Sequence, residues 1–337
     1  MRHRIGMALL LGTIVGIVFV LGCGANAPAP SGGDGLEVTV EGKPTPPPPA
    51  LPAGYRLAFQ RYVGKAAKQT TQIFSMSGST LTQLTGGAGQ GTSNVGPCWG
   101  PDGRSICFSS NRANNGSWAL FTMDADGTGQ TQLTSPPAGA VDSWSDWRGS
   151  SIVFQRDDPS AGVNEYQIMV VSAGGGTPRA LTNGPGVGVY GKDDSPSFSP
   201  DGSMVVFRRS RAADGINGLL TIHTDPASDE APVSLPGTQD ASSPDWFPKA
   251  DGSGSLIVYT DATGPDWGTM IVELDASFHV VAGPTEVCPS AVEAPAGSWD
   301  GKYLTFHDTT DQQVGYMNAD GSGYTLLADG RYAEWAP

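Results

Sequence analysis

Hydrophobic and polar residues alternate over short runs of the chain, and turns rich in glycine, proline and aspartate separate these runs. Ile106 and Phe108 show the alternation directly after the turn Gly100-Pro101-Asp102-Gly103, which is typical of a half-buried β-strand leaving a tight turn. No stretch sustains the period of about 3.6 residues that an amphipathic helix requires. The pattern therefore predicts an all-β fold.

One sequence unit returns along the chain. It is clearest in Pro97–Arg112 and Pro196–Arg211, and weaker copies begin at Ser145, Pro244 and Gly297. Each unit predicts a hairpin, a third strand such as Ala119–Asp124, and a fourth strand that ends near a Gln-Leu-Thr or Ala-Leu-Thr sequence. Four antiparallel strands in about 40 to 50 residues are typical of one β-propeller blade.

An aromatic residue marks what we take to be the same point of every unit, and we interpret these residues as packing between blades: Trp99, Trp147, Phe198, Trp246, Trp299 and Trp335. The segment Leu51–Phe59 looks like the second half of a unit whose first strand is missing, and Glu334–Pro337 supplies that strand. We therefore predict a six-bladed β-propeller of four-stranded antiparallel blades. Its ring is closed by the C-terminal strand joining the first blade, which leaves no open sheet edge.

The N-terminus predicts export. Arg2 and Arg4 precede the apolar run Ile5–Leu21, and Val20-Leu21-Gly22-Cys23 resembles a bacterial lipobox. We predict a lipoprotein signal peptide over residues 1–22, lipidation of Cys23, a Pro/Gly-rich tether over 23–50 and the propeller over 51–337, attached to the periplasmic or extracellular face of the envelope. The alternative is an uncleaved membrane-spanning helix. The apolar run is at the short limit for such a helix, because crossing a bilayer usually takes about 20 residues.

Charge and cysteine content exclude some classes of function. The net charge is −14, so the clustered lysine and arginine that nucleic-acid binding needs are lacking. Cys98 and Cys107 flank a turn at nearly equal distances, so a cross-strand disulfide is geometrically feasible, and at most one intramolecular disulfide can form among Cys98, Cys107 and Cys288. The histidines show no zinc-ligand spacing with these cysteines.

Three features resemble the TolB-type propeller repeat: a Pro-x-Trp-Ser-Pro-Asp-Gly-like opening, a Phe-Ser-Ser-x-Arg-like second strand and a Met-Asp-x-Asp-Gly turn. The resemblance covers nearly all of Leu51–Pro337. Arg148-Gly149 after Trp147, and the inserted Lys249-Ala250, depart from the motif. The TolB family has a further N-terminal domain where this chain has a proline-rich tether. The resemblance implies the propeller fold and a docking surface for envelope proteins at the face where the axial channel opens.

Acidic residues precede the marker aromatics of four or five units, where the inner strand approaches the channel. They are Asp142, Asp146, Asp193, Asp194, Asp240, Asp245, Glu293 and Glu334. Converging on one mouth, they would focus a negative potential that holds a basic peptide or a cation, for which Ca²⁺ is best suited. The alternative is that each carboxylate caps a turn or faces solvent.

Four loop aromatics are candidates either for a contact surface or for packing of a loop on a blade: Trp118, Trp144, Tyr190 and Trp267. No nucleophile elbow, zinc-protease or phosphate-loop motif is present. We therefore predict a monomeric protein-binding module with an envelope protein or peptide as partner, and no enzyme. The alternative is a channel-centred hydrolase or lyase acting on an extracellular saccharide or peptide through the same carboxylates.

Overall fold

The computed structural model describes residues 49–65, 68–86, 91–113, 117–158, 165–182, 191–211, 215–225, 228, 231–262, 268–288 and 292–337. The chain divides into two units, Met1–Pro46 and Pro47–Pro337. The predicted signal peptide, Cys23 and the predicted tether up to residue 48 lie outside the described residues. Within the described ranges, no helix is long and apolar enough to cross a membrane.

The described residues form β-strands and no α-helix, which confirms the all-β class. The strands of the first half are β1 (Arg56–Val63), β2 (Thr70–Ser77), β3 (Thr80–Gln83), β4 (Asn94–Trp99), β5 (Ser105–Ser110), β6 (Ala119–Asp124), β7 (Thr131–Gln132), β8 (Val141–Arg148), β9 (Ser151–Asp157), β10 (Glu165–Ser172) and β11 (Arg179–Ala180). Those of the second half are β12 (Gly191–Phe198), β13 (Met204–Arg211), β14 (Ile216–His223), β15 (Val233–Ser234), β16 (Ala241–Pro248), β17 (Gly254–Asp261), β18 (Gly268–Asp275), β19 (Val280–Cys288), β20 (Val292–Gly297), β21 (Tyr303–Asp308), β22 (Gln313–Asn318), β23 (Thr325–Asp329) and β24 (Arg331–Trp335).

These strands pair mainly with their neighbours in sequence. Four-stranded sheets follow the orders β4-β5-β6-β7, β16-β17-β18-β19, β20-β21-β22-β23 and β24-β1-β2-β3. An eight-stranded sheet consists of two such meanders, β8 to β11 and β12 to β15, joined where β10 and β12 run parallel. In the sheet that contains the first and the last described strands, β24 is antiparallel to β1, with Trp335 opposite Leu57.

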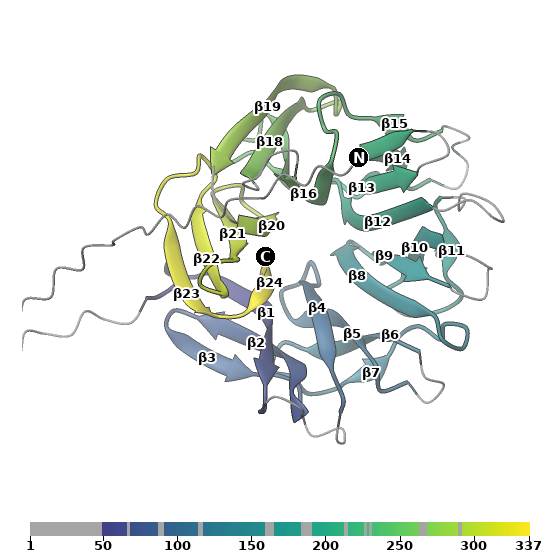
Figure 1. The fold of residues 1–337 in the computed structure, drawn as a ribbon, viewed down its shortest axis with the longest axis vertical. Helices are drawn as coiled ribbons and strands as arrows, with labels where there is room; N and C mark the ends of the chain where they lie inside the picture. The colour runs from purple at the N-terminus through teal and green to yellow at the C-terminus, as the bar shows by residue number, and fades with distance from the viewer. Residues whose placement is uncertain are drawn as a thin grey trace, which may run out of the picture. The chain divides into compact units, whose positions relative to one another are not determined.

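The sheets stand around a common centre, with β4, β8, β12, β16, β20 and β24 nearest to it (Figure 1). We call these six the inner strands. Each inner strand contacts the next one in sequence, and β24 contacts β4. The same part of every meander therefore faces one axis.

Each inner strand has a β-bulge at the same point, where the pairing register shifts by one residue. The first bulge residue has a φ between 49° and 56° in all six strands: Gly96, Trp144, Ser195, Ser243, Ala294 and Tyr332. Five of these six are not glycine, although this left-handed region is unfavourable for side chains with a Cβ. The repetition shows that tertiary packing imposes the same backbone path on different residues.

Hydrophobic clusters lie between neighbouring sheets. Trp99 and Phe108 pack with Ala58 of the β24-β1-β2-β3 sheet, and Trp335 packs with Val314 of the β20–β23 sheet. Four further clusters join the other neighbouring meanders in the same way. Full burial of such a side chain stabilises the fold by roughly 1.5–3 kcal/mol. The predicted packing role holds for the buried marker residues Trp99, Phe198, Trp246 and Trp335.

The register corrects one predicted marker residue. Gly297, and not Trp299, lies opposite Leu304. This is the position at which the other inner strands have their aromatic residue, such as Trp99 and Trp246. The ring of Phe247 fills the space beside it, because a Cβ on residue 297 would come within 2.0 Å of that ring. Trp299 lies two residues later, and its indole N–H donates to the carbonyl of Trp335 at 3.0 Å.

Candidate functional site

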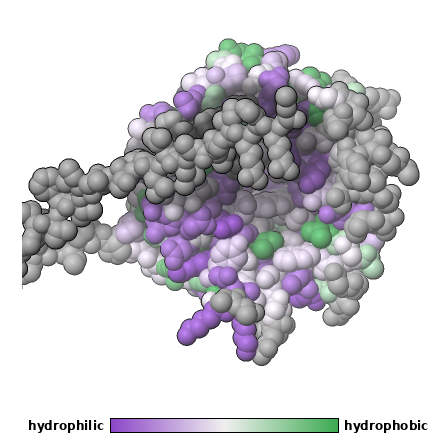
Figure 2. Space-filling model, viewed as in Figure 1, coloured by the Kyte–Doolittle hydropathy of each residue, from purple (hydrophilic) through white to green (hydrophobic). Residues whose placement is uncertain are grey.

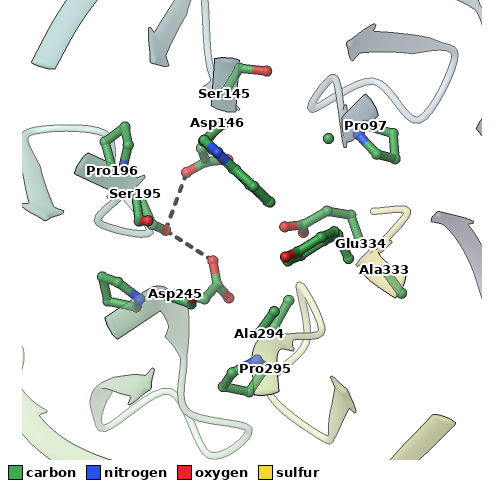
Figure 3. A pocket seen from close by; sticks show the side chains of 17 residues that line it. Pro97, Ser145, Asp146, Ser195, Pro196, Asp245, Ala294, Pro295, Ala333 and Glu334 are labelled. Atoms are coloured by element: carbon green, nitrogen blue, oxygen red, sulfur yellow. Dashed lines mark hydrogen bonds between the residues drawn. The ribbon is translucent and has the colours of Figure 1, made fainter. Parts of the chain in front are cut away.

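Directly after its bulge, each inner strand contributes one residue to a ring around the central axis. This axial ring consists of Cys98, Asp146, Ser197, Asp245, Ala296 and Glu334. Carboxylates alternate with small neutral side chains around it, so the three acids are related by an approximate threefold arrangement. Figure 3 shows Asp146, Asp245 and Glu334 around one central space.

Backbone N–H groups of the next inner strand hold two of these carboxylates. Asp146 Oδ2 accepts from Phe198 N–H at 2.7 Å, and Asp245 Oδ2 accepts from Gly297 N–H at 2.8 Å. Between them, the Ser197 hydroxyl donates to Asp245 Oδ1 at 2.9 Å, and its oxygen lies 3.3 Å from Asp146 Oδ2 (Figure 3). Both acids therefore link neighbouring sheets as well as facing the axis.

Glu334 has a different environment. Its carboxylate has no hydrogen-bond or ion-pair partner among the described residues and points into the central space (Figure 3). Burial raises the pKa of Glu334 well above its usual range, and the nearby charges of Asp245 and Asp146 add to this effect. Burial and the charge of Asp146 also raise the pKa of Asp245 to about 6. The positive charge of Arg148 opposes both shifts.

Arg148 lies two residues after Asp146 on β8, beyond the axial ring as seen from the bulges. Its guanidinium carbon is 3.9 Å from the centre of the Trp299 ring. It forms no ion pair with an acid of the described ranges, and its Nε is buried without a hydrogen-bond partner. Three axial carboxylates thus share one nearby positive charge that none of them contacts as an ion pair.

Two cavities meet at the axial ring. The one on the bulge side, called here the axial cavity, has a volume of about 80 Å³. Trp144 and Tyr332 bound it with rings packed edge to face, 4.4 Å between centres, and the remaining wall includes Pro97, Pro196, Pro244 and Pro295. The second cavity, toward Arg148, has about 20 Å³, which is room for about one water. One face of the molecule is hollowed near its centre (Figure 2).

The environment of Glu334 predicts a pH-dependent stability. A carboxyl whose pKa is raised by folding binds its proton more tightly in the folded protein, so stability falls as pH rises from the ordinary carboxyl range through the raised pKa. We expect Glu334→Gln to increase the free energy of unfolding near pH 8 by about 1 kcal/mol, and to change it little near pH 4.

Urea unfolding at the two pH values measures this difference. Glu286→Gln, which neutralises an exposed carboxylate on β19, is the control and should leave stability unchanged at both. An equal stabilisation by Glu334→Gln near pH 4 would contradict the expectation, because wild-type Glu334 is then already protonated.

Two of the other predicted site residues are buried in ion pairs. The Arg156 guanidinium donates to both oxygens of Asp142 at 2.6 and 2.8 Å. Arg209 donates to both oxygens of Asp193 at 2.7 and 2.8 Å. In both cases acid and base are opposite one another in the pairing of an inner strand with the following strand. Neither carboxylate lines the axial cavity.

Three more predicted residues lie elsewhere on the inner strands or their loops. Asp194 forms an ion pair with Arg208 at 3.1 Å, and burial still raises the pKa of Asp194. Glu293 Oε1 lies 2.9 Å from His307 Nδ1, and this hydrogen bond lowers the pKa of Glu293. Asp240 is exposed at the end of a loop with a φ of 58°. Of the eight predicted acids, the structure brings Asp146, Asp245 and Glu334 together at the axial cavity.

Cys98 and Cys107 lie opposite one another in the β4–β5 pairing. Both cysteines are buried and have free thiols, with no disulfide between them. The Ser145 hydroxyl oxygen lies 3.3 Å from Cys98 Sγ and 3.5 Å from Cys107 Sγ. The cross-strand disulfide stays a prediction. Across the described ranges, no group of three or more His, Cys, Asp or Glu side chains could hold a metal ion. The suggested Ca²⁺ stays a prediction.

The predicted loop aromatics divide between several places. Trp144 lines the axial cavity. Trp118 is half-buried and forms an isolated parallel β-bridge with Val141. Tyr190 and Trp267 lie outside the described residues.

Sequence reasoning missed three residues of the site: Ser197, Tyr332 and Arg148. Ser197 stands directly before Phe198, as Asp146 stands before Trp147, so alignment of the repeats by position would have found it. Tyr332 precedes Glu334 by the spacing that separates Trp144 from the next axial acid. For Arg148 the sequence carries no such signal, because the other repeats have no arginine at that point.

Comparison with known proteins agrees with this architecture. A family model described as the TolB β-propeller domain matches residues 40–250. A crystal structure of TolB from Acinetobacter baumannii has a TM-score of 0.61 at 17% identity, covering 84% of this chain and 67% of that one. A putative TolB from Agrobacterium tumefaciens has a TM-score of 0.51 at 17% identity, covering 82% and 90%.

An oligogalacturonate lyase from Vibrio parahaemolyticus has a TM-score of 0.50 at 13% identity, covering 83% of this chain and 80% of that one. At these identities the structural likeness shows the fold alone. Among curated proteins, none matches this sequence.

Proposed function

Because the chain belongs to the TolB β-propeller family, we propose that it is an envelope lipoprotein that docks a partner protein at its axial cavity. In this proposal residues 1–22 are a signal peptide, Cys23 carries the lipid, and residues 23–50 tether the propeller to the membrane. Residues 51–337 form a six-bladed ring, which the C-terminal strand closes by joining the first blade.

Three observations support the six-bladed ring. The bulge recurs in six inner strands. The hydrophobic clusters join each meander to the next, including the last to the first. The antiparallel pairing of β24 with β1 links the two ends of the propeller sequence in one sheet.

One observation carries the docking role: three carboxylates without cationic partners converge on an open cavity beside Trp144 and Tyr332. Carboxylates in a low-dielectric cleft focus a negative potential, which attracts a basic segment of a partner. Aromatic side chains supply contact area at the centre of protein interfaces. A charged floor with an aromatic rim suits recognition of a protruding polypeptide segment.

Affinity capture tests this role. The intact lipoprotein serves as bait for detergent-solubilised envelopes, beside an Asp146→Asn/Asp245→Asn/Glu334→Gln variant and the Glu286→Gln control. We expect at least one protein to be captured by wild type and by the control but lost from the triple variant. Its capture should weaken when salt is raised above about 0.1 M, where the Debye length is about 10 Å.

Identical sets of captured proteins from all three baits would remove the docking proposal. Thermal unfolding of each bait shows whether loss of capture reflects loss of the fold, since Asp146 and Asp245 also link neighbouring sheets.

The pKa of Asp245, raised to about 6, favours a second candidate function. Paired carboxyls with different pKa values can serve as general acid and general base. The chain would then be a hydrolase or lyase for an extracellular saccharide or peptide. A broad panel of such substrates tests this candidate, which requires turnover by wild type that Glu334→Gln reduces. Turnover that is absent, or equal in the variant, would exclude it.

A further inference from the structure

We propose that the axial cavity binds a lysine side chain of the partner protein, with its ammonium among Asp146, Asp245 and Glu334. This inference rests on the proposed docking function and names the chemistry of the docked segment. Four separate features of the cavity support it: charge, symmetry, wall composition and proton binding.

The first feature is uncompensated charge. The buried acids Asp142 and Asp193 each have a bidentate arginine partner, whereas no axial carboxylate has a cationic partner among the described residues. Removing a carboxylate from water is costly unless a positive group or a proton compensates it. The nearest guanidinium, that of Arg148, is stacked on Trp299 outside the axial cavity. A positively charged group of a ligand would compensate these carboxylates, as arginines compensate Asp142 and Asp193.

The second feature is the symmetry of the axial ring. The three acids occupy alternate positions of six, so they surround the axis at roughly equal angles. An alkylammonium entering along this axis carries three N–H donors, one for each carboxylate. A guanidinium is planar and pairs best with one carboxylate through two parallel hydrogen bonds. The arrangement therefore favours lysine over arginine.

The same geometry distinguishes an ammonium from a metal ion. Ammonium–carboxylate hydrogen bonds span about 2.7–2.9 Å, compared with about 2.3–2.6 Å for Ca²⁺ and its oxygen ligands. Within the described ranges no three acidic, histidine or cysteine side chains are placed to hold a metal. These observations favour an ammonium group over a metal ion at the axial ring.

The third feature is the wall between the bulge side and the axial acids. Trp144, Tyr332 and four prolines line it, so the ligand must pass apolar surface before it reaches the carboxylates. A lysine side chain has this distribution, with an aliphatic stem and a charged end. The aromatic faces also attract a cation as it enters. A volume of about 80 Å³ leaves room for the end of a side chain.

The fourth feature is proton binding by Glu334 at the axial cavity. Burial raises the pKa of Glu334 well above its usual range, which favours the protonated carboxyl. Ammonium binding would favour the charged carboxylate and release that proton. Affinity should therefore increase as pH rises above the ordinary carboxyl range.

The test uses the full chain and three acetylated, amidated Gly/Ser peptides that differ only at a central lysine, Nε-acetyl-lysine or arginine. Binding is followed through the NMR signal of the Trp144 indole N–H, which Trp144→Phe identifies. We expect the lysine peptide to shift this signal and to bind about tenfold or more tightly than either other peptide. Glu334→Gln should weaken it about tenfold, which corresponds to about 1.4 kcal/mol, whereas Glu286→Gln should not.

Glu334→Gln removes no hydrogen bond of the described protein, so a loss of binding by this variant cannot be attributed to a lost structural contact. Equal binding of the acetylated peptide, tighter binding of the arginine peptide, or no lysine-peptide binding at millimolar concentration would each overturn the lysine proposal.

The capture experiment separates this failure from failure of the docking role. A partner lost from the triple variant, together with peptides that do not discriminate lysine, overturns the lysine site and leaves docking in place. Selective binding of the lysine peptide, when no captured protein is lost from the triple variant, would support the lysine site and overturn the docking role.

Discussion

Gly297→Ala should destabilise the protein by about 3 kcal/mol or more, because the new Cβ would lie within 2.0 Å of the Phe247 ring. Phe247 belongs to the hydrophobic cluster between the β16–β19 and β20–β23 sheets, where a buried ring cannot move without disturbing its neighbours. Urea unfolding gives the change in the free energy of unfolding. Gly174→Ala, at an exposed glycine with ordinary φ and a nearest atom at 3.6 Å, is the matched control.

A double-mutant cycle tests the assigned cause. In a Phe247→Ala background the obstructing ring is absent, so Gly297→Ala should cost much less than it does in wild type. Additive effects of the two substitutions would show that Phe247 is not the reason for glycine at this position. A small effect of Gly297→Ala alone would contradict the packing described for this interface.

Arg209→Met should destabilise the protein by about 3–5 kcal/mol, since it leaves the carboxylate of Asp193 buried without its bidentate partner. The measurement is again urea unfolding near pH 7. Arg61→Met is the control, because Arg61 forms a solvent-exposed pair with Asp329, and such pairs contribute roughly 0–1 kcal/mol.

The double variant Asp193→Leu/Arg209→Met should recover much of the lost stability, because it removes both charged groups from the interior together. If the double variant were no more stable than Arg209→Met, loss of arginine packing would explain the effect better than loss of the ion pair. A small effect of Arg209→Met would contradict the expected cost of breaking this buried ion pair.

Residues of the axial ring differ in how much they contribute to the stability of the fold. Asp146, Ser197 and Asp245 accept N–H donors of the following inner strand, so they also hold neighbouring sheets together. Glu334 has no such contact among the described residues. It is therefore the residue at which binding can be changed with the least change in stability.

The sequence alone determined the class of fold and the pairing of its ends. Turn formation by Pro-Asp-Gly and the alternation of strand residues are local properties, and their repetition predicted four-stranded antiparallel units without a tertiary model. The match between Glu334–Pro337 and the start of a repeat predicted the strand that pairs with β1. The TolB-type motif in two good repeats was enough to identify the family.

The assignment of Trp299 as a marker residue was wrong because it depended on local sequence alone. Trp299 follows Gly297 closely enough to imitate the aromatic of the other repeats. Glycine is required because Phe247, fifty residues earlier in sequence, occupies the space across a sheet interface. Nothing in the local sequence of either residue reveals that contact.

The tertiary structure alone decided which acids form the site. Asp142, Asp193 and Asp194 stand opposite arginines in the pairing register, whereas Asp146, Asp245 and Glu334 stand opposite the uncharged Val153, Val258 and Ala58 and face the axis. A one-residue bulge in each inner strand produces this difference. Because side chains of a strand alternate between faces, the one-residue shift at the bulge determines which of the residues after it face the axis.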